Sequence, residues 1–155
     1  MSDDTESGDP EYDLDFREHP EAYYIGRGEQ GVFKVQPYKS ELLPNWTIKN
    51  LDEAEDSAEK IYDQYQSYKE DDDFVGMDMA RKYLQMGYTR AMRYAKYPGG
   101  QKYEKSGDEK TEREPQEWAD EEKREIALVF EEALNRVRED EQYQQMKADH
   151  RERTD

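Results

Sequence analysis

Between residues 51 and 95, two consecutive stretches carry apolar side chains three and four positions apart, and this spacing constrains the fold more than any other feature. The stripe of the first stretch consists of Leu51, Ala54, Ala58, Ile61, Tyr65 and Tyr68. The stripe of the second is made mostly of small residues, namely Ala80, Leu84, Gly87, Ala91 and Ala95. Residues at these spacings share one face of an α-helix. The pattern predicts two helices, and the second has a face that another helix can approach closely.

Signals at the ends of these stretches support the same interpretation. Asn50 is a favourable N-cap, and Glu53 follows at the spacing of a capping box. The first helix is predicted to end near Lys69, before a run of three aspartates. A third helix is predicted over about Gln116–Arg138, where inward-facing apolar residues recur, and a short fourth helix around Tyr143.

The N-terminal part of the chain has strand-like residues on both sides of three glycines. Tyr, Ile, Val and Phe at 22–25 and 32–35 favour strands, and a glycine-rich connection between two such runs is typical of a β-hairpin. The predicted fold class is therefore α+β, mainly α, with an N-terminal β-hairpin packed on a small bundle of three to four helices.

The same glycines, Gly26, Gly28 and Gly31, have the G-x-G-x-x-G spacing of phosphate-binding loops. A dinucleotide fingerprint needs a helix directly after the third glycine, but a strand-like run and Pro37 follow here. The kinase motifs H-R-D and D-F-G are missing from the sequence. We therefore expect a turn with positive φ angles that displays Arg27 and Glu29, and no cofactor.

Composition predicts a small intracellular protein. The chain has 155 residues, a formal net charge of −17, 33% apolar residues and no cysteine, and no apolar run approaches the length that spans a bilayer. We expect a disordered acidic leader at 1–19, a single globular domain at 20–148 and a frayed tail at 149–155. The acid excess fits adaptation to a high-salt cytoplasm, and sticky acidic tails on an ordinary cytoplasmic protein are the alternative.

Charge is distributed unevenly, because residues 79–103 contain six bases and no acid. Arginine and lysine neutralise phosphates, and aromatic rings stack on unpaired bases. The candidate binding residues are therefore Arg27, Lys34, Lys39, Arg81, Lys82, Arg90, Arg93, Lys96 and Tyr94.

Several stretches together resemble a known family. They are I-G-R-G-E-Q-G-V-F (25–33), P-Y-K-S-E-L-L-P-N-W (37–46), S-A-E-K-I-Y (57–62) and D-F-V-G-M-D-M-A-R-K-Y-L-Q-M-G-Y-T-R-A-M-R-Y-A (73–95). Over roughly residues 20–150 the chain is similar to the domain of unknown function 4385 family of archaea, bacteria and tailed phages. The resemblance implies a small intracellular domain and assigns no catalytic residue.

The function expected from these patterns is non-enzymatic binding of nucleic acid or another polyanion by a basic and aromatic surface. One alternative is a protein-interaction or structural module whose bases are paired internally. Another is a small enzyme with a pocket between the hairpin and the second helix, using Arg27, Lys34, Lys39, Asp78 and Arg90. No metal site is expected, because His19 and His150 are far apart in sequence and Asp71–Asp73 can serve to cap a helix. A membrane partner is not expected either, given the net negative charge.

Overall fold

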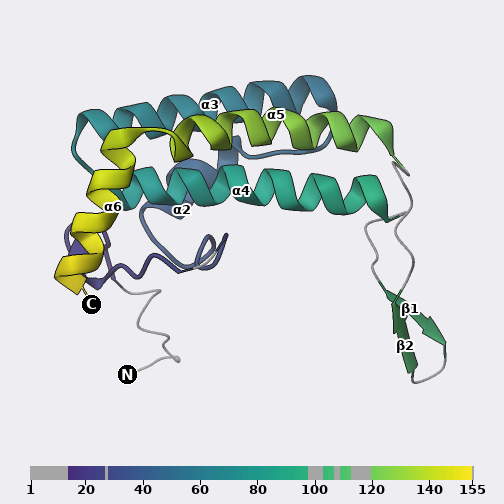
Figure 1. Ribbon diagram of the computed structural model, residues 1–155, viewed down its shortest axis with the longest axis horizontal. Coiled ribbons are helices and arrows are strands. Elements are labelled where there is room, and N and C mark those ends of the chain that lie inside the picture. The colour runs from purple at the N-terminus through teal and green to yellow at the C-terminus, as the bar shows by residue number, and fades with distance from the viewer. Residues whose placement is uncertain (1–13, 27, 98–102, 107–108, 113–119, 155) are drawn as a thin grey trace.

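The computed structural model describes residues 14–26, 28–97, 103–106, 109–112 and 120–154. The elements follow in the order η1 (Pro20–Ala22), α2 (Tyr38–Leu42), η2 (Leu43–Asn45), α3 (Leu51–Glu70), α4 (Phe74–Lys96), β1 (Tyr103–Ser106), β2 (Glu109–Glu112), α5 (Glu121–Arg138) and α6 (Glu141–Thr154). The helices α3, α4 and α5 lie side by side, with α4 antiparallel to the other two, and α6 crosses the N-terminal end of α4 (Figure 1). The four predicted helices are thus confirmed, although the fourth, expected to be short, extends over Glu141–Thr154, and the predicted start of the third at Gln116 lies outside the described residues.

Side-chain caps begin three of the four long helices. Asn50 Oδ1 accepts the backbone N–H of Glu53 at 2.8 Å, as predicted for the N-cap. Glu53 Oε2 returns the interaction by accepting from the Asn50 side-chain amide at 2.8 Å, in place of the backbone N–H that a capping box uses. Asp73 caps α4 and Asp120 caps α5, each by accepting a backbone N–H in the same way. Each cap satisfies an N–H group that the helix itself leaves unpaired.

The small residues on α4 allow α5 to pack closely against it. Gly87 is buried at this contact, and a Cβ added to it would clash with the Phe130 ring of α5. The close approach predicted from the small-residue stripe is therefore confirmed.

No residue described between 22 and 35 lies in a strand. The glycine loop (residues 26–31) turns the chain through positive φ angles of 68°, 54° and 90° at its three glycines, as predicted. Tight turns follow it, in which Val32 N–H donates to the Glu29 carbonyl at 3.3 Å and Lys34 N–H to the Gly31 carbonyl at 3.1 Å. Tyr, Ile and Val side chains of this segment are buried against the helices instead of forming one face of a sheet.

The predicted α+β class is consequently wrong, because the folded body is helical and the N-terminal β-hairpin does not form. The strands that the structure does describe are β1 and β2, which pair antiparallel with Tyr103 opposite Glu112. They lie between α4 and α5 in the sequence and project from the end of the helical body (Figure 1). They make no sheet with the N-terminal segment.

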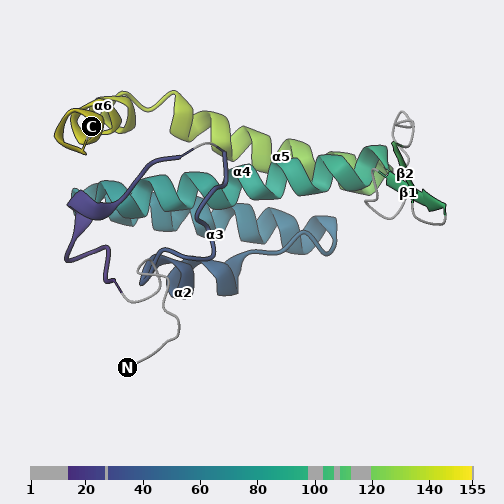
Figure 2. The same ribbon diagram turned by 90° about the horizontal axis from the view of Figure 1, so that it is seen from below.

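Both end segments of the described chain pack on the body. Phe16, within the expected leader, is 4% exposed, and its N–H donates to the Gln36 carbonyl at 2.9 Å. His150, within the expected tail, is 5% exposed on α6. Figure 2 shows the N-terminal segment passing along α4 toward α6. Residues 1–13 of the expected leader lie outside the described residues.

Candidate anion-binding groove

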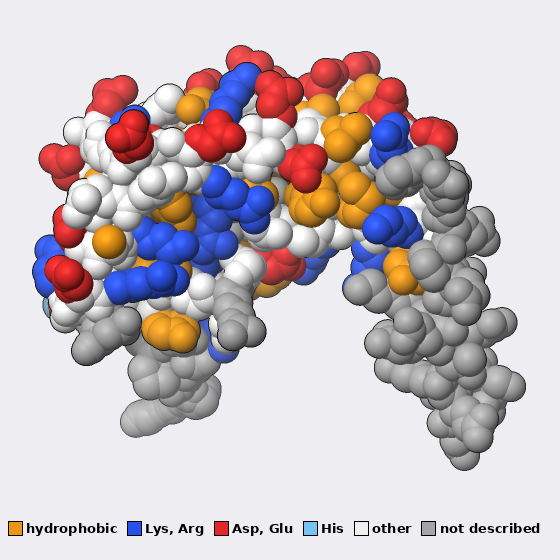
Figure 3. All heavy atoms as spheres, in the orientation of Figure 1, with side chains coloured by type: hydrophobic (Ala, Val, Ile, Leu, Met, Phe, Trp, Pro, Cys, Tyr) orange, Lys and Arg blue, Asp and Glu red, His pale blue; other side chains and the backbone are white. Residues whose placement is uncertain are grey.

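The surface carries its charges in separate regions. Asp and Glu side chains follow the edge formed by α3 and α5, whereas Lys and Arg side chains gather over α4 and beside α6 (Figure 3). The described bases of the predicted stretch differ in their surroundings, because Arg81 and Lys82 are buried whereas Arg90, Arg93 and Lys96 are exposed.

The first half of α4 turns charged side chains into the core. Asp78 is fully buried and accepts hydrogen bonds from Tyr23 Oη at 2.5 Å and Tyr143 Oη at 2.6 Å. Arg81 completes the cluster, with Nε 3.0 Å and Nη2 2.9 Å from Asp78 Oδ1. The cluster joins the N-terminal segment, α4 and α6, which are distant in sequence.

Together, burial and the neighbouring charges keep the two phenols and the guanidinium of this cluster protonated. Burial raises the pKa of Tyr23 well above its ordinary value, and the Asp78 carboxylate raises it further. The pKa of Tyr143 is raised by the same two causes. Burial lowers the pKa of Arg81, but Asp78 and the two tyrosines more than offset this, so that it ends above its ordinary value. The cluster is an internal ion pair bridged by two phenols, so Arg81 is engaged inside the protein.

The cations of this half of α4 also hold the glycine loop. Arg81 Nη1 donates to the Gly28 carbonyl at 2.5 Å, and Lys82 Nζ donates to the Gln30 carbonyl at 2.6 Å. A phosphate-binding loop turns backbone N–H groups toward its ligand. This loop turns carbonyl oxygens toward two buried cations, an arrangement that suits a structural turn.

Arg90 and Tyr94, from the second half of α4, lie on a different surface. Together they line a groove of about 340 Å³ with Trp46, Thr47, Ile48, Lys49 and Lys123. We call it the basic groove, because three cations and two aromatic rings line it and no described carboxylate does. The indole Nε1 of Trp46 donates to the Tyr83 carbonyl at 3.0 Å, which fixes the ring at the groove.

Lys123 crosses the groove from the start of α5. Its Nζ donates to the Ile48 carbonyl at 2.5 Å and lies 3.3 Å from the Lys49 carbonyl. The same atom is 5.7 Å from the centre of the Tyr94 ring. These neutral partners orient the ammonium group, and no carboxylate among the described residues forms an ion pair with it.

Arg90 is the exposed arginine of the groove. Its Nε is 3.8 Å from Glu29 Oε1, and the other Glu29 oxygen accepts the Thr89 hydroxyl at 2.6 Å. The guanidinium carbon lies 5.7 Å from the centre of the Phe33 ring. The long separation from Glu29 and the exposure of Arg90 make this a weak ion pair.

The other predicted binding residues lie elsewhere. Lys34 follows the glycine loop and Lys39 lies in α2, and both are partly buried. Arg93 and Lys96 are exposed in the last turn of α4, where positive charge favours the helix C-terminus. Arg27 lies outside the described residues. Of the predicted binding residues that the structure describes, only Arg90 and Tyr94 line the basic groove.

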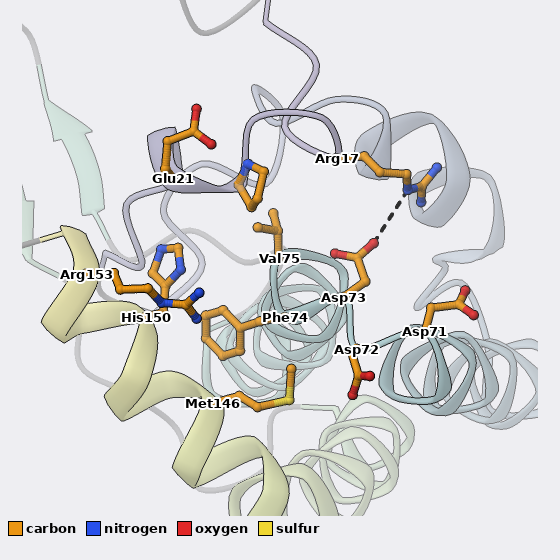
Figure 4. Close-up of a pocket in the computed structure, with 11 residues that line it drawn as sticks. Arg17, Glu21, Asp71, Asp72, Asp73, Phe74, Val75, Met146, His150 and Arg153 are labelled. Atoms are coloured by element: carbon orange, nitrogen blue, oxygen red, sulfur yellow. Dashed lines mark hydrogen bonds and ion pairs between the residues drawn. The ribbon is translucent and has the colours of Figure 1, made fainter.

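A larger hollow, of about 490 Å³, lies at the N-terminal end of α4. Figure 4 shows Phe74, Val75 and Met146 within it, with Arg17, Asp71, Asp72, Asp73, His150 and Arg153 around them. Arg17 binds Glu41 in a bidentate manner at 2.8 and 2.9 Å and reaches Asp73 at 3.4 Å. His150 Nε2 lies 2.7 Å from the Tyr23 carbonyl. These interactions hold the N-terminal segment and α6 to the end of α4.

Within the described residues, no three His, Asp or Glu side chains are grouped so that they could hold a metal ion. The pocket expected between the N-terminal segment and α4 is a hollow of about 80 Å³ lined by Tyr23, Gly31 and Lys82 among others. Asp78 is buried beside Arg81 instead, and Arg90 belongs to the basic groove. Of the expected enzyme residues, Arg27 lies outside the described part of the chain, and none of Lys34, Lys39, Asp78 and Arg90 lines this hollow.

Comparison with known proteins identifies the chain at the level of a family. The family model described as "Domain of unknown function (DUF4385)" matches residues 6–153. The chain belongs to the DUF4385 family. No curated protein and no solved structure matches it. The resemblance inferred from the motifs is thereby confirmed.

Five of the seven residues that line the groove in this DUF4385 chain were not predicted from the sequence as binding residues. Trp46 reads as a core residue and Lys49 as a loop residue, while Lys123 reads as one charge on a charged helix. Their sequence positions carry no signal that α5 begins beside the 46–49 segment. None of the helices described in this DUF4385 chain combines the length and apolar character needed to cross a bilayer.

Proposed function

We propose that this DUF4385 chain is a non-enzymatic protein that binds single-stranded nucleic acid in the basic groove. The carrying observation is a groove lined by three cations and two aromatic rings, and by no described carboxylate, in a chain with 40 acids and 23 bases. Acids are common enough in this sequence that their exclusion from one concave surface needs a physical reason. An anionic ligand supplies one.

The aromatic rings favour nucleic acid over other polyanions. Tyr94 is 40% exposed, so part of its ring is available to a base. Stacking on an aromatic side chain tolerates any base, while cations follow the phosphate backbone. A volume of about 340 Å³ is small among ligand sites, which suits one or two nucleotides at a time.

Fluorescence anisotropy with a labelled oligothymidylate tests this function. The comparison ligand is an abasic strand of the same length, which carries the same phosphates and lacks the bases. We expect tighter binding of the oligothymidylate, because only it can stack. Equal affinity for the two strands would instead assign the groove to polyanions in general, and no binding of either at low salt would refute the proposal.

Substitution locates the binding on the protein. Tyr94→Ala is expected to weaken oligothymidylate binding roughly 5- to 100-fold, the range for loss of one stacked base. Tyr24→Ala is the matched control, because Tyr24 is 75% exposed and lies outside the groove. Equal losses in the two variants would show that the groove is not the binding surface.

A further inference from the structure

A second basic surface lies where α5 meets α6. It consists of Arg138, the last residue of α5, with Lys147 and Arg151 four residues apart on α6. Lys147 lies against the ring of Tyr143, whose hydroxyl donates to Asp78, the buried partner of Arg81. We call it the α5–α6 patch. Figure 3 shows Lys and Arg side chains gathered beside α6 and over the first half of α4.

Neutral groups are the partners of this patch. Arg138 Nη2 donates to Gln85 Oε1 at 2.7 Å, and Lys147 Nζ lies 5.9 Å from the centre of the Tyr143 ring. Among the described residues no carboxylate forms an ion pair with Arg138, Lys147 or Arg151. The acid beneath them, Asp78, is already bound by Arg81 and two tyrosines.

The cations of the patch are close enough to repel one another. Burial lowers the pKa of Lys147, and the charges of Arg151, Arg81 and Arg138 lower it further. Lys147 and Arg151 are four residues apart on α6, where like charges destabilise a helix. This repulsion opposes folding in the free protein, and a bound anion would remove it.

We propose that the α5–α6 patch binds the phosphate chain of a compact polyphosphate. Guanidinium forks and an ammonium group match phosphate oxygens in charge and geometry. The nearest ring, that of Tyr143, is only 4% exposed, so the patch has no surface on which a base could stack. This site is independent of the basic groove and of the function proposed there.

Isothermal titration calorimetry of the full chain with inorganic tripolyphosphate tests the site. The test variant is Lys147→Gln/Arg151→Gln. The control variant is Lys60→Gln/Arg136→Gln, which removes the same charge from two helix residues that pair with acids. The test variant is expected to weaken binding at least about tenfold, because it removes two charge-assisted contacts. The control is expected to keep the wild-type affinity.

Thermal unfolding provides a second readout. Without ligand, the test variant should melt at or above the wild-type temperature, since like-charge repulsion is relieved. Tripolyphosphate should raise the melting temperature of the wild type and of the control more than sodium chloride does at equal ionic strength. A nucleoside triphosphate should bind with the affinity of tripolyphosphate, since the phosphate chain alone is recognised.

Three results would overturn the proposal. They are equal affinities of the test and control variants, no heat of binding at millimolar tripolyphosphate, and a thermal shift that sodium chloride reproduces. Arg90→Gln, in the basic groove, should leave tripolyphosphate binding unchanged. Loss of tripolyphosphate binding in that variant would contradict a separate site, whereas failure of oligothymidylate binding bears only on the groove.

Discussion

A carboxylate without exposed surface is tolerated only when its lone pairs and its charge are both satisfied. Asp78 meets this condition through two phenols and one guanidinium, which come from three separate segments of the chain. Arg81 depends on Asp78 in return, because it is 7% exposed and its other hydrogen bond within the described residues goes to the Gly28 carbonyl. Replacing either Asp78 or Arg81 alone is therefore expected to lower the free energy of unfolding substantially.

Asp78→Asn is expected to lower the free energy of unfolding by about 3–5 kcal/mol, because it leaves the buried charge of Arg81 uncompensated. Urea unfolding followed by circular dichroism measures the change. The control is Asp56→Asn, which breaks an exposed pair with Lys60 and should cost less than about 1 kcal/mol. A similar cost for both substitutions would mean that the buried pair contributes no more than a surface pair.

Among the elements, α4 determines how the others are arranged. Helix α5 packs on the face of α4 that carries small residues, with Phe130 of α5 against Gly87. Arg81 and Lys82 of α4 donate hydrogen bonds to carbonyls of the glycine loop. Alanine is a better helix former than glycine by about 1 kcal/mol, so propensity alone favours Gly87→Ala. The Phe130 ring leaves no room for the added methyl group.

We therefore expect Gly87→Ala to destabilise the protein by about 1–2 kcal/mol despite the gain in helix propensity. Phe130→Leu combined with it should recover part of the loss, because a smaller side chain frees the contested space. Denaturant unfolding of the two single variants and the double variant gives the coupling. Additive effects would show that the two residues do not interact.

The elements also show where prediction from sequence succeeds. Helices α3, α4 and α5 follow from apolar spacing within each helix, and the starts of α3 and α4 follow from the capping residues Asn50 and Asp73. The sequence predicts only a short helix where α6 extends over Glu141–Thr154. The prediction of strands in the 22–35 segment was wrong, because backbone carbonyls of this segment accept hydrogen bonds from side chains more than 50 residues away. Lys82 Nζ, for example, donates to the Gln30 carbonyl. A helical wheel places Lys82 on a polar face and carries no information that another segment covers that face. Lys123 likewise reaches the 46–49 segment only through the packing of α5.

At the scale of the whole molecule, acids exceed bases by 40 − 23 = 17, so at least that many cannot find a separate cation. Acidic side chains follow the α3–α5 edge (Figure 3), where they repel one another through water. Salt at molar concentration shortens the range of this repulsion to about 3 Å. Adaptation to a salty interior, proposed from composition, therefore has a direct physical test.

The melting temperature is expected to rise by roughly 5 °C or more between low and molar potassium chloride, which corresponds to about 1–2 kcal/mol for a chain of this size. Differential scanning calorimetry at matched pH measures it. Screening also weakens exposed ion pairs such as Lys60–Asp56 and Arg136–Glu132, which opposes the expected rise. A melting temperature that falls with salt would show that ion pairs outweigh repulsion and would contradict high-salt adaptation.

The contact between His150 and the Tyr23 carbonyl spans 127 positions of the chain. A ribosome releases residue 23 long before residue 150, so the N-terminal segment must wait for the C-terminal helix before its final hydrogen bonds form. During that interval the glycine loop can already meet α4, whereas the hydroxyl of Tyr143 is still to come. The N-terminal segment of the nascent chain therefore completes its packing last. A truncation within α6 that removes His150 would remove the hydrogen bond that joins the two end segments of the described chain.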